Sequence, residues 1–255
     1  MASKMWPYTL RQSFPKYMSA IFQKPIVLIT AGPTREAIDP VRYITNHSSG
    51  KMGYAIAESF LEKGFAVVLV SGPVTLKLAH PNLTNIAVTS ADEMYNACRP
   101  YFLTAQIAVF AAAVADYKSA EVCTQKMKKS GNELNLRLVK NVDIAYEFGQ
   151  LKQKGQLSVG FALETNDEEQ NALKKLNTKN LDMVILNSVQ DEGATFGYDT
   201  NKITIINQDL VSRTFPLKSK KEVGKDIADA AISYANNQSS FQQTLKTNHH
   251  ELHTV

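Results

Sequence analysis

The sequence predicts an α/β fold in which helices flank a mostly parallel sheet. Short apolar runs of the kind found in buried strands recur along the chain, and amphipathic helical patterns separate most of them. Strands that alternate with helices indicate parallel pairing with right-handed crossovers. No internal repeat and no separating linker interrupts the pattern, so we expect one domain over residues 25–235.

Strands are predicted where apolar and β-branched residues follow one another. The expected strands cover residues 25–30, 66–72, 85–90, 156–165 and 181–189, with a further strand inside 105–117. Residues 201–209 alternate apolar and polar side chains, which is typical of an antiparallel edge strand.

Helices are predicted between these strands. The expected helices cover residues 51–64, 91–102, 167–180 and 219–235. Ser90 stands where an N-cap is needed, and Gly64 stands where a helix would stop. The lysine-rich segment 126–140 breaks the alternation, so we expect it to be an inserted loop or ribbon within the single domain.

The composition limits the class of protein. A net charge of +4 suits an anionic small molecule and does not require a nucleic acid. No apolar run reaches the roughly 18 to 20 residues that span a bilayer, so we expect no membrane partner. Two cysteines, Cys98 and Cys123, are too few for a disulfide framework and fit a reducing, cytoplasmic compartment.

The two ends differ from the middle of the chain. Residues 1–24 are basic and free of acidic residues, so we expect an N-terminal arm, either a short leader or an oligomer contact. Residues 236–255 are polar and are predicted to form a frayed tail. Three histidines in this tail also suit a metal ion, but the tail interpretation is favoured.

Small and hydroxyl-bearing residues follow several predicted strands. They form the segments TAGPT, VSGP, AAAVADY, GFALET and LNSV. Ligands of open parallel sheets bind outside the carboxyl ends of the strands, and small residues allow the backbone to approach a ligand closely. The sequence therefore predicts a ligand site at this edge of the sheet.

The segment SSGKMG precedes the helix predicted at 51–64. Ser48, Ser49 and Gly50 place hydroxyl and main-chain donors at a helix N-terminus, where the dipole favours an anion. Asn46 adds a donor and an acceptor. A phosphate or carboxylate site fits this pattern, and so does an N-cap serine followed by a glycine packed on the sheet. The segment matches neither G-x-x-x-x-G-K-[ST] nor G-x-G-x-x-G, so neither mechanism applies.

Charged residues near the same edge have two interpretations each. Lys126 belongs to a lysine cluster that either closes over a polyphosphate during nucleotidyl transfer or forms a solvated face. Asp116 suits a ribose hydroxyl or Mg²⁺, or caps the next turn. Lys175 and Lys179, four residues apart on a helix, either receive a phosphate together or form a solvent-facing stripe.

Together these segments resemble phosphopantothenoylcysteine synthetase, the second activity of the bacterial bifunctional coenzyme A biosynthesis protein. The resemblance covers roughly residues 25–235 and rests on segments in the same order and rough spacing: ITAGPTREAIDPVRYITNHSSGKMGYAIA, AAAVADY, KMKK, KNVDI, GFALET, LNSV and FGYDTNKITII. It implies a Rossmann-like fold. Only 24 residues precede it, so we expect a stand-alone synthetase, with any decarboxylase as a separate partner.

The resemblance implies a Mg²⁺-dependent ligase reaction. The carboxylate of 4′-phosphopantothenate attacks the α-phosphate of CTP, pyrophosphate leaves, and the amine of L-cysteine then displaces CMP from the acyl-cytidylate. The lysine-rich loop favours CTP over ATP. Two departures from the usual pattern, Val142 for a proline and Leu163 for an alanine, bear on nucleotide preference rather than on the reaction.

The resemblance also assigns residues to roles. Catalytic roles fall to Arg42, Asn46 and Lys126. Nucleotide contacts are implied for Phe110, Ala111, Ala112, Asp116, Lys126, Val142, Asp143, Ile144, Ala145, Phe161, Lys175 and Lys179. Contacts to the substrate or its phosphate are implied for Gly32, Arg42, Asn46, Ser48, Ser49 and Gly50. A homodimer is implied, with contacts expected around residues 117–140 and 201–207.

Two other classes of function were weighed against this resemblance. A nicotinamide-dependent oxidoreductase requires a dinucleotide fingerprint, which the segment after the first strand lacks. A binding module for RNA or for another protein is suggested by the basic loop and the basic N-terminus. The mild net charge argues against RNA.

Overall fold

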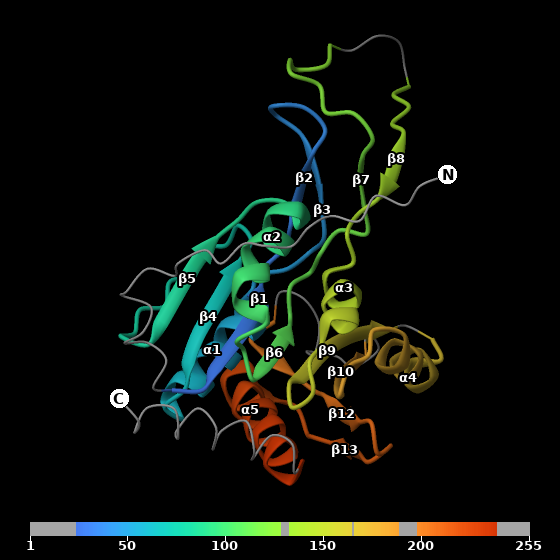
Figure 1. Ribbon diagram of the computed structural model, residues 1–255. Coiled ribbons are helices and arrows are strands. Elements are labelled where there is room, and N and C mark those ends of the chain that lie inside the picture. The colour runs from blue at the N-terminus through green and yellow to red at the C-terminus, as the bar shows by residue number, and fades with distance from the viewer. Residues whose placement is uncertain (1–23, 129–132, 165, 189–197, 239–255) are drawn as a thin grey trace, which may run out of the picture.

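The computed structural model describes residues 24–128, 133–164, 166–188 and 198–238. Within these residues, eight strands form one sheet (Figure 1). Their order across the sheet is β13 (Ser212–Thr214), β12 (Thr204–Asn207), β10 (Met183–Ser188), β9 (Leu157–Glu164), β6 (Ile107–Phe110), β1 (Ile26–Ala31), β4 (Ala66–Ser71) and β5 (Leu83–Ala87). All neighbours from β10 to β5 are parallel, which confirms the predicted α/β fold.

Two predictions about strands were wrong in position. The strand expected at the antiparallel edge, β12, pairs with β10 on one side and with β13 on the other. Strand β13 has three exposed residues and no apolar side chain, so the apolar pattern of the sequence does not predict it. The strand expected at 85–90 runs from Leu83 to Ala87, because the chain must leave the sheet to enter the helix that Ser90 caps.

Helices cover both faces of the sheet (Figure 1). One face carries α1 (Lys51–Glu62) and α5 (Lys220–Asn237), and the other carries α2 (Ala91–Phe102), α3 (Ile144–Leu151) and α4 (Glu168–Thr178). Successive residues of β1 and β4 alternate between the two core clusters, as side chains of a strand must. The predicted caps are confirmed: Ser90 accepts a hydrogen bond from Glu93 N–H, and Gly64 follows α1 with a φ of +87°.

Helix α3 was not predicted from the sequence. This helix has only eight residues and therefore little periodicity. Tertiary packing stabilises it instead. The Phe148 ring is buried and lies 4.5 Å from the Phe102 ring and 6.1 Å from the Phe110 ring, centroid to centroid. Burial of such a side chain contributes about 1.5–3 kcal/mol to the free energy of folding. Contacts from α2 and β6 therefore stabilise a helix that the local sequence pattern does not predict.

Two antiparallel ribbons project from the carboxyl edge of the sheet (Figure 1). One consists of β2 (Arg35–Ala37) and β3 (Tyr43–Thr45), and the other of β7 (Tyr117–Ser119) and β8 (Leu138–Lys140). The second ribbon confirms the predicted insertion, although residues 129–132 lie outside the described residues. A third, small ribbon, β11 (Thr200–Asn201) with β14 (Lys218–Ser219), lies at the start of α5.

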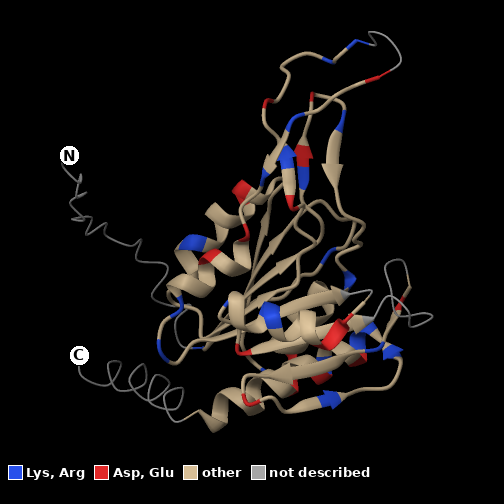
Figure 2. Cartoon of the chain, turned by 90° about the vertical axis from the view of Figure 1, so that its right-hand side faces the viewer, with Lys and Arg blue, Asp and Glu red and all other residues tan. Residues whose placement is uncertain are grey.

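Charged residues are distributed as this architecture requires. Figure 2 shows sheet strands that are almost free of charged residues, whereas Lys, Arg, Asp and Glu mark the projecting ribbons and the outer helices. The expected arm at 1–24 and tail at 236–255 lie almost entirely outside the described residues. Within the part of the chain that is described, no helix has both the length and the apolar character needed to cross a bilayer.

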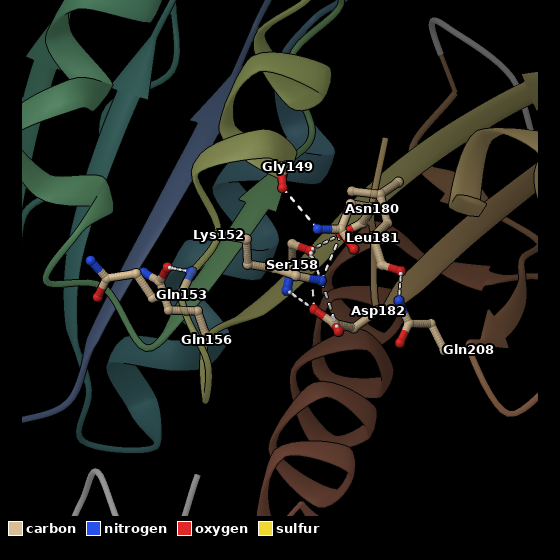
Figure 3. A network of polar contacts seen from close by, with 9 residues as sticks. All are labelled: Gly149, Lys152, Gln153, Gln156, Ser158, Asn180, Leu181, Asp182 and Gln208. Carbon is tan, nitrogen blue, oxygen red and sulfur yellow. Dashed lines mark hydrogen bonds and ion pairs between the residues drawn. The ribbon is translucent and has the colours of Figure 1, made fainter. Parts of the chain in front are cut away.

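A polar network ties the connection before β9 to the connection before β10, at the amino end of the sheet (Figure 3). Lys152 Nζ donates to Asn180 O at 2.6 Å and to Asp182 Oδ1 at 3.0 Å. Asp182 Oδ2 accepts a hydrogen bond from Ser158 N–H at 2.6 Å, and Asn180 Nδ2 donates to Gly149 O at 2.8 Å. The network fixes the C-terminal ends of α3 and α4. The ligand-binding residues predicted on α3 lie at its other end, whereas Lys175 and Lys179 lie at the end of α4 that the network holds.

Candidate active site

A cavity of about 1150 Å³ lies over the carboxyl ends of the central strands. Thr30 of β1, Phe110 of β6, Phe161 of β9 and Asn187 of β10 form its base. The start of α1 bounds it on one face of the sheet, and α3 and α4 bound it on the other. The cavity therefore lies at the edge where the small-residue segments predict a ligand site.

The wall of the cavity is built from the extensions of β1 and β6. Ala113 N–H donates to Gly32 O at 2.9 Å, and Thr34 N–H donates to Ala113 O at 3.3 Å. Ala115 N–H donates to the Thr34 hydroxyl oxygen at 3.0 Å. These bonds hold the AAAVADY segment along the edge of the sheet. Its small side chains, Ala111 to Ala113, leave space for a ligand.

Asn46 is exposed and lines this cavity. Its Nδ2 donates to Val114 O at 2.9 Å, which joins the segment before α1 to the segment after β6. The preceding residue is anchored too, because the Thr45 hydroxyl donates to Thr34 O at 2.6 Å. Two hydrogen bonds thus hold the Asn46 amide at the cavity wall.

The segment before α1 presents main-chain donors to the cavity. Gly50 is the N-cap of α1, with a φ of +76° and no side-chain cap bond to the first turn. Its own N–H donates to Ser48 Oγ at 3.2 Å. The serine N-cap interpretation is therefore wrong, whereas close glycine packing is confirmed: a Cβ on Gly53 would lie 2.6 Å from Ala31 Cβ. The first-turn N–H groups of α1 face a cavity that suits an anion.

The opposite end of the cavity is formed by α3 and α4. Asp143 is the N-cap of α3 and accepts a hydrogen bond from Tyr146 N–H at 3.1 Å. It also forms an ion pair with Lys179, at 2.8 Å between Nζ and Oδ2. Lys175 Nζ lies 3.4 Å from Phe161 O. Lys175 and Lys179 line the cavity together, with Lys179 already paired to a carboxylate.

Acidic side chains at the cavity are few and separated. Asp116 is exposed at the rim, and its main-chain oxygen accepts a hydrogen bond from Asn141 N–H at 2.8 Å. Glu147 lines the cavity from α3. Among the described residues, no three His, Cys, Asp or Glu side chains group as metal ligands. Mg²⁺ in nucleotide enzymes is held by one or two carboxylates together with substrate phosphates. The described lining fits this kind of site and does not fit a site made of protein ligands alone.

Three of the predicted site residues do not line the cavity: Gly32, Arg42 and Lys126. Gly32 is buried directly behind Gly50. Arg42 binds Asp39 through Nε at 3.0 Å and through its terminal nitrogen. Lys126 is exposed in the segment that follows β7.

The Asp39–Arg42 pair holds the base of the lysine-rich segment. Met127 N–H donates to Asp39 Oδ2 at 3.1 Å, and Arg42 donates to Met127 O at 3.1 Å. The Arg42 guanidinium beside Asp39, helped by main-chain N–H donors, keeps the pKa of this carboxyl far below its ordinary value despite burial. Arg42 and Lys126 are therefore neighbours through Met127, on the ribbons above the cavity.

Several residues that line the cavity were not predicted from the sequence. They are Lys51, Lys140, Glu147, Asn187, Asn201 and Lys220. Lys51 and Asn187 lie inside the SSGKMG and LNSV segments. The sequence predicts that these segments border the ligand site, but it does not single out these two residues. No sequence pattern around Lys220 or Asn201 indicates a ligand site. Their positions depend on how α5 packs against α1, where a Cβ on Gly224 would lie 2.8 Å from the Ala55 main chain.

Comparisons with known proteins identify the family of this chain. Residues 22–234 match the family model of the DNA/pantothenate metabolism flavoprotein C-terminal domain. The chain is 48% identical over 211 residues to a cysteine/cysteine sulfinic acid decarboxylase of an unknown prokaryote (81% of this chain, 59% of the relative). It is 47% identical over 219 residues to the coenzyme A biosynthesis bifunctional protein CoaBC of Haemophilus influenzae (86% and 52%). The chain thus spans little more than half the length of these relatives.

The fold recurs in a crystal structure of the C-terminal domain of the coenzyme A biosynthesis bifunctional protein CoaBC. That structure superposes with a TM-score of 0.71 at 40% sequence identity, and the match covers 84% of this chain and 99% of that one. Because nearly all of that domain is matched, the chain corresponds to the C-terminal part of the bifunctional relative.

Proposed function

Because this chain belongs to the family of the DNA/pantothenate metabolism flavoprotein C-terminal domain, we propose that it is a phosphopantothenate–cysteine ligase. The observation that carries the proposal is the cavity lining. All but three of the residues to which the sequence resemblance assigns a role gather around one cavity at the carboxyl edge of the sheet. The similarity to a CoaBC C-terminal domain supports the same assignment.

The proposed reaction has two steps. A carboxylate oxygen of 4′-phosphopantothenate attacks the α-phosphorus of CTP, the bond to the β-phosphate oxygen breaks, and pyrophosphate leaves. The amine of L-cysteine then attacks the activated carbonyl carbon, loses a proton, and expels CMP. A carboxylate alone is a poor electrophile, so the nucleotidyl ester supplies the leaving group. The protein's task is to position the reactants and to stabilise negative charge.

The residues at the two ends of the cavity suit different parts of this reaction. Val142 to Ala145, with Phe161, form the surroundings proposed for the base, and Lys175 and Lys179 stand beside them. Asn46, held by Val114 O, is proposed to bind the carbonyl or carboxylate that reacts. Lys126 is proposed to reach the triphosphate from the ribbon that Arg42 anchors.

Magnesium would enter with the nucleotide in this proposal. When bound, it would screen the phosphate charge, and Asp116 is the carboxylate we propose as its protein contact. A separate decarboxylase is proposed to act on the cysteine carboxylate of the product.

We also propose that two copies of the chain associate through the projecting ribbons. Exposed apolar side chains gather there, among them Tyr43, Tyr117, Leu138 and Val139. The other contact expected from the sequence, at 201–207, is largely buried within a single chain, since Asn201, Ile203, Ile205 and Ile206 are at most 5% exposed. A monomeric mass by light scattering at micromolar concentration, with full activity, would contradict the dimer.

An exchange experiment tests the first step alone. Protein, 4′-phosphopantothenate, Mg²⁺ and CTP are mixed with labelled pyrophosphate, and cysteine is omitted. Reversible formation of the acyl-cytidylate moves label into CTP, and the exchange requires 4′-phosphopantothenate. Exchange that persists without 4′-phosphopantothenate, or no exchange with CTP or ATP, would refute the proposed reaction.

A further inference from the structure

The cavity has a second group of lysines, on the opposite face of the sheet from Lys175 and Lys179. Lys51 begins α1 and Lys220 begins α5, and both line the cavity. Helices α1 and α5 pack against each other, and Asp199 interacts with both starting residues. None of the roles assigned above uses either residue.

The immediate contacts leave this group with incomplete charge compensation. Lys51 forms an ion pair with Asp199, whose side chain is 83% exposed. Lys220 Nζ donates to Tyr198 O, a neutral acceptor, at 2.6 Å. Burial and the nearby Lys51 charge lower the pKa of Lys220, although Asp199 opposes that shift. Among the described residues, two cations therefore face one cavity with Asp199 as the solvated carboxylate between them.

The remaining neighbours also suit an anion. Asn187 and Asn201 line the same end of the cavity. Asn201 is 2% exposed, and its Nδ2 contacts with other described residues are long, 3.5 Å to Asn187 Oδ1 and 3.8 Å to Met52 Sδ. Its amide hydrogens are thus available to a stronger acceptor. The first turn of α1, which has no side-chain cap bond, lines the same cavity.

We propose that Lys51 and Lys220 form a subsite for a phosphoryl group, in which the phosphate replaces Asp199 as the partner of Lys51. The proposal rests on the ligase function, because two of the proposed substrates carry phosphate: the triphosphate of the nucleotide and the terminal phosphate of 4′-phosphopantothenate. The cavity crosses the sheet edge from α3 and α4 to α1 and α5. A ligand with its base at the first end would deliver phosphates to the second.

Pyrophosphate is the probe that separates this subsite from catalysis. Binding of pyrophosphate, CTP and CMP is measured by calorimetry for the unmodified protein, Lys220→Gln and Lys221→Gln. Lys221 is the matched control, because it is the next residue of α5 and faces Glu58 and Glu62 instead of the cavity. We expect Lys220→Gln to weaken pyrophosphate binding at least tenfold and Lys221→Gln to leave it within twofold.

The pattern across ligands identifies the phosphate. If Lys220→Gln weakens CTP but not CMP, the subsite takes the triphosphate. If pyrophosphate and CTP are unaffected but the KM for 4′-phosphopantothenate rises tenfold, the subsite takes the phosphate of that substrate. Unchanged binding and KM values, or equal losses in Lys220→Gln and Lys221→Gln, would overturn the subsite. A protein that binds pyrophosphate through Lys220 but forms no product would retain the subsite and refute the ligase.

Discussion

The side-chain amide of Asn46 donates a hydrogen bond to the main-chain oxygen of Val114 at 2.9 Å. This contact joins two segments that lie 68 residues apart in the sequence, one before α1 and one after β6. The two segments form adjoining walls of the cavity. The amide that we propose to act on the reacting carboxyl group is therefore held in place before any ligand binds.

Asn46→Asp is expected to reduce product formation about a hundredfold, because a carboxylate repels both the Val114 oxygen and the reacting carboxylate. Nucleotide binding should change less than threefold. Asn46 is exposed, so the melting temperature should move by no more than about 2 °C. Asn237→Asp, at the end of α5, is the control. Normal product yield from Asn46→Asp would remove Asn46 from the mechanism.

Lys126→Gln is expected to lower kcat/KM with the nucleotide by about tenfold to a hundredfold, since one cation near the triphosphate is lost. Lys126 is exposed, so the free energy of unfolding should change by no more than about 0.5 kcal/mol. Steady-state kinetics and urea unfolding measure the two effects. Lys154→Gln is the control, because Lys154 is exposed at the amino end of the sheet. Stability lost together with activity would instead indicate a structural role.

Gly50→Ala should destabilise the fold by more than Gly64→Ala. Both glycines have positive φ angles, of +76° and +87°, so each substitution costs roughly 1–2 kcal/mol of backbone strain. Only at Gly50 would the new Cβ also meet a neighbour, Val74 Cγ1 at 2.9 Å. Gly50→Ala should also weaken pyrophosphate binding, whereas Gly64→Ala should not. Equal unfolding free energies for the two variants would show that Val74 moves away from the new Cβ at no cost in stability.

Asp39→Asn is expected to destabilise the fold at neutral pH, and the difference from the unmodified protein should shrink in acid. The pKa of Asp39 is lowered in the fold, so its carboxylate contributes stability that is complete above the unfolded pKa of about 3.9. That contribution is lost as the pH falls below this value. Urea unfolding between pH 7 and pH 3 measures it, with Asp229→Asn, which removes an exposed ion pair with Lys63, as the control. A constant difference across this range would show that Asp39 does not stabilise the fold as a carboxylate.

The sequence predicted the parts of the fold that local patterns specify. The central strands β1, β4, β6, β9 and β10 contain apolar runs, and Ser90 and Gly64 mark helix ends that the structure confirms. It did not predict α3, whose Phe148 is held by rings from other elements, or β13, which has no apolar residue. These elements depend on tertiary contacts rather than on propensity.

The candidate site divides in the same way. Residues that follow strands directly, such as Ala111 and Phe161, were predicted because parallel strands end at one edge. Lys220 was not, because its place at the cavity depends on the packing of α5 against α1 across more than 150 residues of sequence. Arg42 was assigned to the substrate, whereas its contacts in the structure are with Asp39 and with the segment that carries Lys126.

Nucleotide-dependent amide formation is the most direct test of the proposed ligase. Purified protein is mixed with 4′-phosphopantothenate, L-cysteine and Mg²⁺, with CTP or ATP in parallel, and the products are read by mass spectrometry. We predict 4′-phosphopantothenoyl-L-cysteine and CMP in equal amounts with CTP, and little product with ATP. Product with ATP alone would keep the reaction and refute the nucleotide assignment. Absence of product with both nucleotides would contradict the ligase itself.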